Sequence, residues 1–224
     1  MRRRDLLRYA AELGWRDPPE PVGPAPAPPG QGPASPAEAR SLDELAALAE
    51  TCTLCGLAEG RRHVVFGEGD PSARLMFVGE GPGAEEDRTG RPFVGQAGRL
   101  LDAMIVALGL ARSQVYIANV VKCRPPGNRN PQETEMAACA PWLERQIELI
   151  RPEVIVALGK VAANRLTGTT KPMKDLRGRW ASHRGIPLLA TYHPAYLLRN
   201  PRDKRLAWED LKLVKRRLGE ASGG

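Results

Sequence analysis

The chain has 224 residues, 42% hydrophobic and 26% charged, and this length and composition favour one globular domain. Its 33 Lys and Arg against 26 Asp and Glu give a net charge of +7, which favours a polyanionic partner. No apolar run approaches the roughly 18 residues of a membrane span, and no apolar segment follows the basic start as in a secretory signal. We therefore expect a cytoplasmic protein without membrane contact.

The first 36 residues differ in composition from the rest of the chain. Nine prolines lie between Pro18 and Pro36, and such a stretch buries too little apolar surface to offset the entropy lost on ordering. A short helix with an apolar face is expected at Arg4–Leu13. Residues 1–36 are therefore interpreted as an N-terminal arm and disordered linker, a candidate docking segment for another protein.

Residues 37–220 are expected to form the folded domain. Ser41-x-x-Glu44 has the form of a capping box, which predicts a helix over Leu42–Glu50. Beyond it, short apolar runs alternate with helical patterns. The runs predict strands at Leu75–Val78, Val115–Val121, Val154–Leu158 and Leu188–Tyr192, and the patterns predict helices at Ala97–Leu108, Glu133–Ile150, Val161–Leu166 and Arg205–Leu218. This alternation predicts an α/β fold, with a parallel sheet between helices.

Polar and glycine-rich residues follow the predicted strands. Gly79–Gly83 follows the first strand, Asn119 lies in the second, Gly159 and Lys160 follow the third, and His193 follows the fourth. Ligands bind outside the carboxyl ends of the strands in such sheets, so we expect a site at this edge. Each segment alone is equally compatible with glycine and proline that merely end a strand.

All four cysteines fit the pattern of a single metal site. Cys52 and Cys55 form a C-x2-C pair, and Cys123 and Cys139 follow with 15 residues between them. Four thiolates suit either zinc or an iron–sulfur cluster, and the spacing does not choose between them. Reduced cysteines packed as small hydrophobic residues are the main alternative, and a redox-active pair is disfavoured because neither Cys52 nor Cys55 starts a helix after a strand.

Four segments taken together resemble the family 4 uracil-DNA glycosylases. They are Gly79–Asp87, Thr89–Gly95, Asn119–Pro126 and His193–Pro201, and the similarity spans about Leu42 to Leu218 and includes the four cysteines. The resemblance implies a three-layer sandwich with a central four-stranded parallel sheet. It also implies a [4Fe-4S] cluster on those cysteines and hydrolytic excision of uracil from DNA, which leaves an abasic site without strand cleavage.

Uracil excision requires a pocket that receives a flipped base and reads its edge. Phe93 resembles the residue of the family that stacks on the base, and Asn119 matches the amide that accepts from N3–H and donates to O4. His193 alone of the three histidines follows a predicted strand, and we expect it to donate to O2 as negative charge develops there. Backbone amides of Gly79–Gly83 are expected to hold the uracil carbonyls, and Gly81 lets that backbone approach closely.

Two carboxylates are candidates for positioning the attacking water. Glu80 is the first choice and Glu86 the second, although the resemblance also implies that Glu86 excludes the methyl group of thymine. Leu197 resembles the wedge that fills the gap left by the flipped base, with Leu198 as its nearest rival. Basic residues near the expected site are candidates for phosphate contacts, namely Lys122, Arg124, Arg129, Lys160 and Arg199.

The sequence thus predicts a monomeric, monofunctional uracil-DNA glycosylase of the prokaryotic cytoplasm, associated with the nucleoid. One alternative is a noncatalytic or covalent uracil-DNA binder. A related group traps uracil-DNA through a histidine in a basic loop, and Cys123–Pro131, the corresponding stretch, contains none, which disfavours the covalent form. The other alternative is a metal-stapled DNA-binding module, which binds DNA whether or not uracil is present. A third alternative, an electron-transfer protein, is disfavoured because the Gly-Glu-Gly-Pro-Gly and His-Pro segments would have no function in it.

Overall fold

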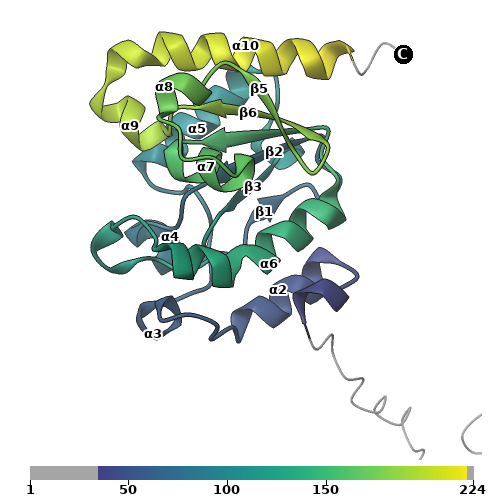
Figure 1. Cartoon of the computed structure of the whole chain (residues 1–224), viewed down its shortest axis with the longest axis vertical. Coiled ribbons are helices and arrows are strands. Elements are labelled where there is room, and N and C mark those ends of the chain that lie inside the picture. Colours follow the sequence, from purple (N-terminus) through teal and green to yellow (C-terminus); the bar gives the residue numbers. More distant parts are fainter. Residues whose placement is uncertain (1–34, 221–224) are drawn as a thin grey trace, which may run out of the picture. The chain divides into compact units, whose positions relative to one another are not determined.

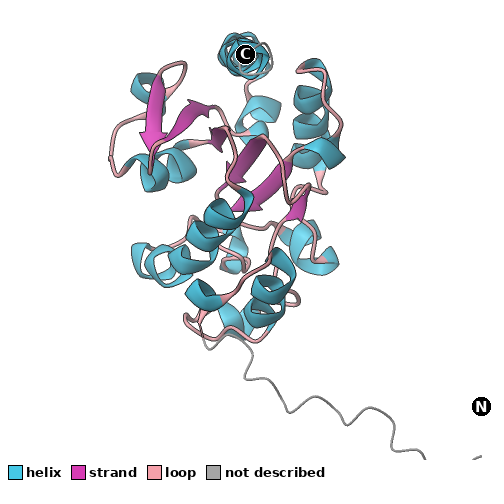
Figure 2. Ribbon diagram, turned by 90° about the vertical axis from the view of Figure 1, so that its right-hand side faces the viewer, coloured by secondary structure: helices cyan, strands magenta, loops and turns pink. Residues whose placement is uncertain are grey.

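A computed structural model describes residues 35–220, in which one sheet lies between two layers of helices (Figures 1 and 2). The strands are β1 (Glu68–Gly69), β2 (Leu75–Gly79), β3 (Tyr116–Asn119), β4 (Val154–Leu158), β5 (Trp180–His183) and β6 (Ile186–Thr191). The helices are α2 (Leu42–Glu50), α3 (Leu57–Gly60), α4 (Ala84–Thr89), α5 (Gln96–Ala107), α6 (Glu133–Ile150), α7 (Lys160–Thr167), α8 (Met173–Leu176), α9 (Pro194–Arg199) and α10 (Lys204–Glu220). The helix expected at Arg4–Leu13 and the arm as far as residue 34 lie outside the described residues. None of the described helices is long and apolar enough to cross a membrane.

The sheet has a parallel core with one antiparallel strand at each edge. Its strand order is β1-β3-β2-β4-β6-β5, and β3, β2, β4 and β6 run parallel to their neighbours in that core. The predicted α/β sandwich with four parallel strands is therefore confirmed. The edge strands β1 and β5 were not expected, because β1 has only two residues and three of the four residues of β5 are exposed, so neither forms an apolar run.

The β5–β6 hairpin can be recognised from its turn residues, although not from the pattern of apolar residues. Arg184 and Gly185 alone connect the two strands, and their φ angles are 48° and 84°. A two-residue turn with both φ angles positive suits the right-handed twist of paired strands, and glycine is favoured in it. The dipeptide therefore accounts for the hairpin without any contribution from apolar side chains.

Side chains of the parallel strands alternate between two hydrophobic cores. In β2, Met76 and Val78 pack with α2, α6 and α7, whereas Leu75 and Phe77 pack with α5, α9 and α10. Figure 1 shows α10 and α5 on one side of the sheet and α6 and α2 on the other. All five residues of β2 are buried, which explains why the strand is a continuous apolar run in the sequence.

Most predicted boundaries agree with the structure to within two residues. The bounds of α2, α6 and β4 are as predicted, and the Ser41 hydroxyl caps α2 by accepting from the Glu44 backbone N–H at 3.2 Å. The expected strand Val115–Val121 is too long, because β3 ends at Asn119. Val120 and Val121 are buried beyond the strand, so the apolar run continues after the sheet pairing stops.

Candidate active site

A cavity of about 420 Å³ opens at the carboxyl ends of the parallel strands. It is lined by the loops that follow β2 and β3 and by the start of α9. All six residues predicted to form the pocket lie in its wall, namely Glu80, Gly81, Glu86, Phe93, Asn119 and His193. Asn128, Asn130 and Tyr196 also line it and had no predicted role, although each lies in or just beyond a segment that carries the family resemblance.

The last residue of β2 provides the surface against which two pocket side chains pack. Gly79 pairs in register with Asn119 across β2 and β3. A Cβ atom at Gly79 would overlap the Asn119 side chain and lie 2.6 Å from Cζ of Phe93. Only a residue without a side chain therefore lets the amide and the ring lie over the end of the strand.

The amide of Asn119 carries an unused acceptor. Asn119 is 1% exposed, and its buried Oδ1 receives no hydrogen bond from any described residue. A buried acceptor without a partner costs about 1–3 kcal/mol, so such an atom in a cavity wall indicates a ligand that supplies a donor. The complementary amide nitrogen allows the same side chain to donate to a neighbouring acceptor on that ligand.

The environment of His193 fixes its tautomer, which the sequence leaves open. Its Nδ1 accepts from the Ala195 backbone N–H at 3.1 Å, so the proton of the neutral ring resides on Nε2. Burial lowers the pKa of His193 to about 4, and the charge of Arg199 acts in the same direction against a smaller opposing effect of Glu86. His193 is therefore neutral at pH 7, and its Nε2–H has no acceptor among the described residues.

Two features hold His193 in place. Gly159 has φ of 87°, and a Cβ atom there would lie 2.9 Å from the Cβ of His193, so the histidine packs directly against a glycine that adopts a left-handed conformation. Thr191, two residues earlier, donates to the buried Asp210 at 2.7 Å, and Arg177 pairs with the same carboxylate at 2.6 Å. These contacts fix the end of β6 against α10. Neither contact is visible as a sequence motif.

The two candidate carboxylates have different surroundings. Glu86 accepts three backbone hydrogen bonds, from Gly83 at 3.1 Å, Val94 at 2.9 Å and Gly95 at 3.0 Å. Glu80 receives none at its carboxylate from the described residues, and burial raises its pKa. The geometry therefore favours Glu80 as the group that meets a water molecule and gives Glu86 the task of bracing two loops.

Gly81 lines the cavity, as expected, but its missing side chain also makes room for a protein side chain. A Cβ atom at this position would lie 2.7 Å from Cγ2 of Val121. A side chain at this position would therefore require Val121 to shift, so glycine here serves packing against the segment after β3 as well as access to the cavity. This contact was not accessible to the sequence, because it joins residues forty positions apart.

The four cysteines line a second cavity, next to α2 and α6. All four are free thiols; Cys123 and Cys139 are buried and Cys52 and Cys55 are half-buried. Most of the other lining residues are apolar, namely Ala49, Leu54, Ala58, Val64, Ala138 and Trp142, together with Arg61 and Lys122. Within residues 35–220, no three His, Cys, Asp or Glu side chains converge on the position of a single metal ion, so the fit of a larger group rests on the four thiols that line one cavity.

Nitrogen donors surround the thiols. The backbone N–H of Lys122 donates to Sγ of Cys139 at 3.3 Å, and Nη1 of Arg61 donates to Sγ of Cys123 at 3.5 Å. The indole Nε1 of Trp142 is buried and has no acceptor among the described residues. The donor set of this cavity therefore suits a guest that carries several sulfur acceptors.

Comparison with known proteins identifies the family. The profile of the Uracil DNA glycosylase superfamily matches residues 66–212. The chain belongs to this superfamily. It is 48% identical to the type-4 uracil-DNA glycosylase of Thermotoga maritima over 170 residues, which cover 73% of this chain and 88% of the relative. It is 45% identical to the type-4 enzyme of Sulfurisphaera tokodaii over 78% of this chain and 84% of the relative.

The relatives also support the predicted branch of the superfamily. Two type-5 uracil-DNA glycosylases, of Pyrobaculum aerophilum and Thermus thermophilus, are each 37% identical to the chain, which is below the identities of both type-4 enzymes. The resemblance to the family 4 glycosylases is therefore confirmed.

The predicted wedge, Leu197, is buried in the structure. Leu197 is 1% exposed and packs in the core shared with α5 and α10, whereas Leu198 is 39% exposed. Consecutive residues of a helix point about 100° apart, so only one of two adjacent leucines in α9 faces solvent. A side chain that enters a DNA duplex has to be reachable at the surface, so in this conformation Leu198, the predicted rival, is the better placed of the two.

The basic residues predicted to contact phosphate differ in their surroundings. Lys122 is 2% exposed, and its Nζ donates to the backbone oxygen of Asn119 at 2.9 Å and to Gln146 at 2.5 Å, so its predicted contact with phosphate is wrong. Arg129 pairs with Glu135 at 2.6 Å. Arg124 is half-buried and its Nε donates to Asn128 at 2.8 Å, whereas Lys160 and Arg199 are exposed. None of these three forms an ion pair with the described residues, so they remain candidates for holding the DNA backbone.

Proposed function

We propose that this protein is a monofunctional uracil-DNA glycosylase of base excision repair. It flips uracil out of DNA and hydrolyses the N-glycosidic bond, leaving an abasic site. The observation that carries the proposal is the unpaired, buried Oδ1 of Asn119 at the end of β3, in a cavity that also contains a neutral histidine donor. Membership of the superfamily and 39–48% identity to several type-4 enzymes support it.

Recognition of the flipped base follows from the pocket walls. Phe93 offers its ring as a stacking surface, and Asn119 accepts from N3–H of uracil and donates to O4. Cytosine has an acceptor at N3 and a donor at its exocyclic amine, so the same amide orientation leaves buried groups mispaired. Uracil supplies the donor that Oδ1 of Asn119 lacks.

The chemical step needs a donor at uracil O2 and a nucleophile at the sugar. As the bond between N1 and C1′ breaks, its electron pair stays with uracil, and Nε2–H of His193 stabilises the resulting charge at O2. A water molecule held by the Glu80 carboxylate forms the new bond to C1′ and gives its proton to that carboxylate. Because burial raises the pKa of Glu80, this group is a stronger base than an exposed glutamate.

We propose that the four cysteines bind a [4Fe-4S] cluster, as the family resemblance implies. The four free thiols on one cavity and the unpaired indole N–H of Trp142 suit a sulfur-rich guest. When bound, the cluster supplies a cross-link between the Cys52–Cys55 loop, the segment after β3 and α6. None of the four cysteines lines the cavity assigned to excision.

We propose a monomer that works on DNA in the prokaryotic cytoplasm. We also propose residues 1–36 as the segment that docks on a protein partner. Lys160, Arg199 and Leu198 are the exposed residues assigned to the DNA.

An end-labelled oligonucleotide with a single uracil tests the proposed function. Incubation with excess DNA followed by alkali is expected to cut the strand at the uracil position over many turnovers, with release of free uracil. Matched strands with cytosine or thymine at that position are expected to stay intact. Binding without release of uracil would identify a noncatalytic binder, and equal binding of all three strands would identify a general DNA-binding module.

A further inference from the structure

The ring of Phe93 is carried by an unusual backbone conformation. Its φ is 51°, in the left-handed region that is sparsely occupied by bulky residues. Backbone in such a region persists only when the surrounding structure holds it there. The conformation brings the ring to the cavity, where its centroid lies 5.6 Å from that of His193. The groups that hold this loop therefore also set the position of the ring.

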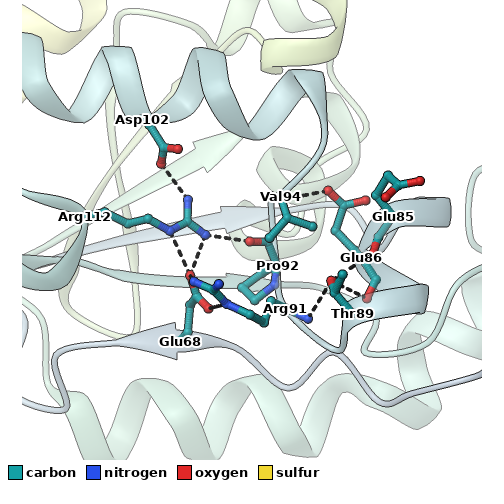
Figure 3. A network of polar contacts seen from close by, with 9 residues as sticks. All are labelled: Glu68, Glu85, Glu86, Thr89, Arg91, Pro92, Val94, Asp102 and Arg112. Atoms are coloured by element: carbon teal, nitrogen blue, oxygen red, sulfur yellow. Dashed lines mark hydrogen bonds and ion pairs between the residues drawn. The ribbon is translucent and has the colours of Figure 1, made fainter.

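The loop is held on both sides of Phe93. Before it, the carbonyl oxygen of Pro92 accepts from Nη2 of Arg112 at 2.6 Å. After it, the backbone N–H groups of Val94 and Gly95 donate to the Glu86 carboxylate. Figure 3 shows the bonds of Pro92 and Val94 on opposite sides of the loop.

Helix α5 closes the third side of the loop. A Cβ atom at Gly98, in the first turn of α5, would overlap the carbonyl group of Phe93. The loop therefore rests directly on the helix backbone. With Pro92, Val94 and Gly95 already bonded, little freedom is left to the segment.

Arg112 is itself braced by two acidic side chains. Its Nε donates to Glu68 of β1 at 2.8 Å, and its Nη1 donates to Asp102 of α5 at 2.7 Å. Arg91 also pairs with Glu68 at 2.8 Å, as Figure 3 shows. Burial alone would raise the pKa of Glu68, but its hydrogen bonds with Arg91 and Arg112 outweigh this effect and lower the pKa. Glu68 is therefore ionised at neutral pH and anchors the guanidinium.

We propose that Arg112 is a positioning residue for the base-stacking ring of this glycosylase. By fixing the carbonyl of Pro92, it holds Phe93 in the left-handed conformation that presents the ring to the flipped uracil. The inference rests on the proposed function, since stacking on uracil is the task assigned to the ring. Arg112 does not line the cavity, so it acts through the loop and not on the substrate.

Arg74 offers a matched control elsewhere in the fold. It forms a forked pair with Glu153 at 2.6 and 2.8 Å and donates to the backbone oxygen of Leu218 at 2.8 Å. It immediately precedes β2, whereas the cavity lies at the carboxyl ends of the strands. Arg74→Met therefore removes the same kinds of bond as Arg112→Met without touching the Phe93 loop.

The first measurement needs no substrate. Hydrogen–deuterium exchange of the full-length protein is expected to show faster exchange at the amides of Val94 and Gly95 in Arg112→Met than in wild type or Arg74→Met. Equal exchange in all three proteins would overturn the inference, because the loop would then be held without Arg112. If Arg112→Met does not fold, Arg112→Lys takes its place, since lysine keeps one charge but cannot bond three acceptors in a planar fork.

The second measurement separates positioning from stability. In single-turnover cleavage of a uracil-containing duplex, Arg112→Met is expected to raise the half-saturating enzyme concentration about tenfold, in the range of a lost stacking contact, while Arg74→Met leaves it unchanged. Arg112→Met is expected to add little in a Phe93→Ala background, because the ring it positions is absent. Additive effects, or equal effects of the two arginines, would overturn the inference. If wild type releases no uracil, the proposed function fails, and the exchange measurement decides the role of Arg112.

Discussion

The base-binding cavity and the cysteine cavity differ in the kind of group each lacks. In the first, a buried acceptor, Oδ1 of Asn119, has no donor among the described residues. In the second, a buried donor, Nε1 of Trp142, has no acceptor among them. In the proposed function, uracil would supply an N–H to the one and the sulfur atoms of a cluster would supply an acceptor to the other. The two unpaired atoms are therefore of opposite sense, as the two proposed guests require.

The two cavities also differ in how they are built. The base-binding cavity is formed by loops at the ends of strands, where ionisable side chains meet solvent. The cysteine cavity lies against the core that includes α2 and α6, and most of its lining residues are apolar. Lys122 connects the two cavities, since its backbone N–H donates to Cys139 and its Nζ donates to the backbone oxygen of Asn119. We therefore expect changes in the first cavity to alter chemistry and changes in the second to alter stability.

Loss of a thiol is expected to have the largest effect. Cys139→Ser should abolish the visible absorption of an iron–sulfur cluster and lower the melting temperature strongly, because a bound cluster contributes directly to folding free energy. Ala138→Ser, which adds a hydroxyl to the same cavity wall, is the control and should retain colour and stability. Thermal unfolding and absorption spectra of the two variants provide the measurement. A colourless wild type with stoichiometric zinc would contradict the cluster assignment.

The second largest effect is expected at His193 and should leave the cysteine cavity intact. His193→Ala should lower the single-turnover rate by about 10² to 10³, the scale for removal of one oxyanion donor, with little change in DNA affinity. The visible spectrum should stay that of wild type. A wild-type rate, or a loss of rate that only follows lost binding, would remove His193 from the chemical step.

The third prediction concerns stability against pH. Because burial lowers the pKa of His193 from 6.5 to about 4, the unfolded chain takes up a proton between these values and the folded chain does not. Stability is therefore fully present above pH 6.5 and falls with decreasing pH, by about 3 kcal/mol for this residue. Urea unfolding at several pH values should show a shallower acid slope for His193→Ala. Identical slopes for variant and wild type would show that the ring titrates normally.

The smallest effect on activity is expected at the leucines of α9. Leu198→Ala should slow excision a few-fold in duplex DNA and leave single-stranded substrate unaffected, because only a duplex has a gap to fill. Its stability should stay within about 0.5 kcal/mol of wild type. Leu197→Ala is the counterpart and should destabilise the fold as a core truncation does. The reverse pattern would restore Leu197 as the wedge.

The sequence predicts what depends on local pattern. Uninterrupted apolar runs mark the parallel strands because these are buried on both faces, and the capping residues locate α2. The edge strand β5 does not follow from such a run, because it pairs through its backbone while most of its side chains face solvent. The pocket residues could be grouped in advance, since parallel strands bring their carboxyl ends to one edge.

Roles that depend on contacts between distant segments could not be predicted. Glu80 and Glu86 can be given different roles only once it is known that the backbone N–H groups of Val94 and Gly95 donate to Glu86. The choice between Leu197 and Leu198 depends on which face of α9 meets α5 and α10. The tautomer of His193 depends on one backbone N–H, and the burial of Lys122 depends on where Gln146 lies.

Gly79 sets a limit for anyone who would redesign this enzyme to remove a different base. Enlarging or reshaping the pocket invites substitutions along the end of β2. A single methyl group at this position would displace both the Asn119 amide and the Phe93 ring, to which we assign base reading and stacking. Such a change would disturb selectivity and stacking together. New selectivity therefore has to be introduced from the facing side, through position 119 or the loop after β3, with Gly79 left as it is.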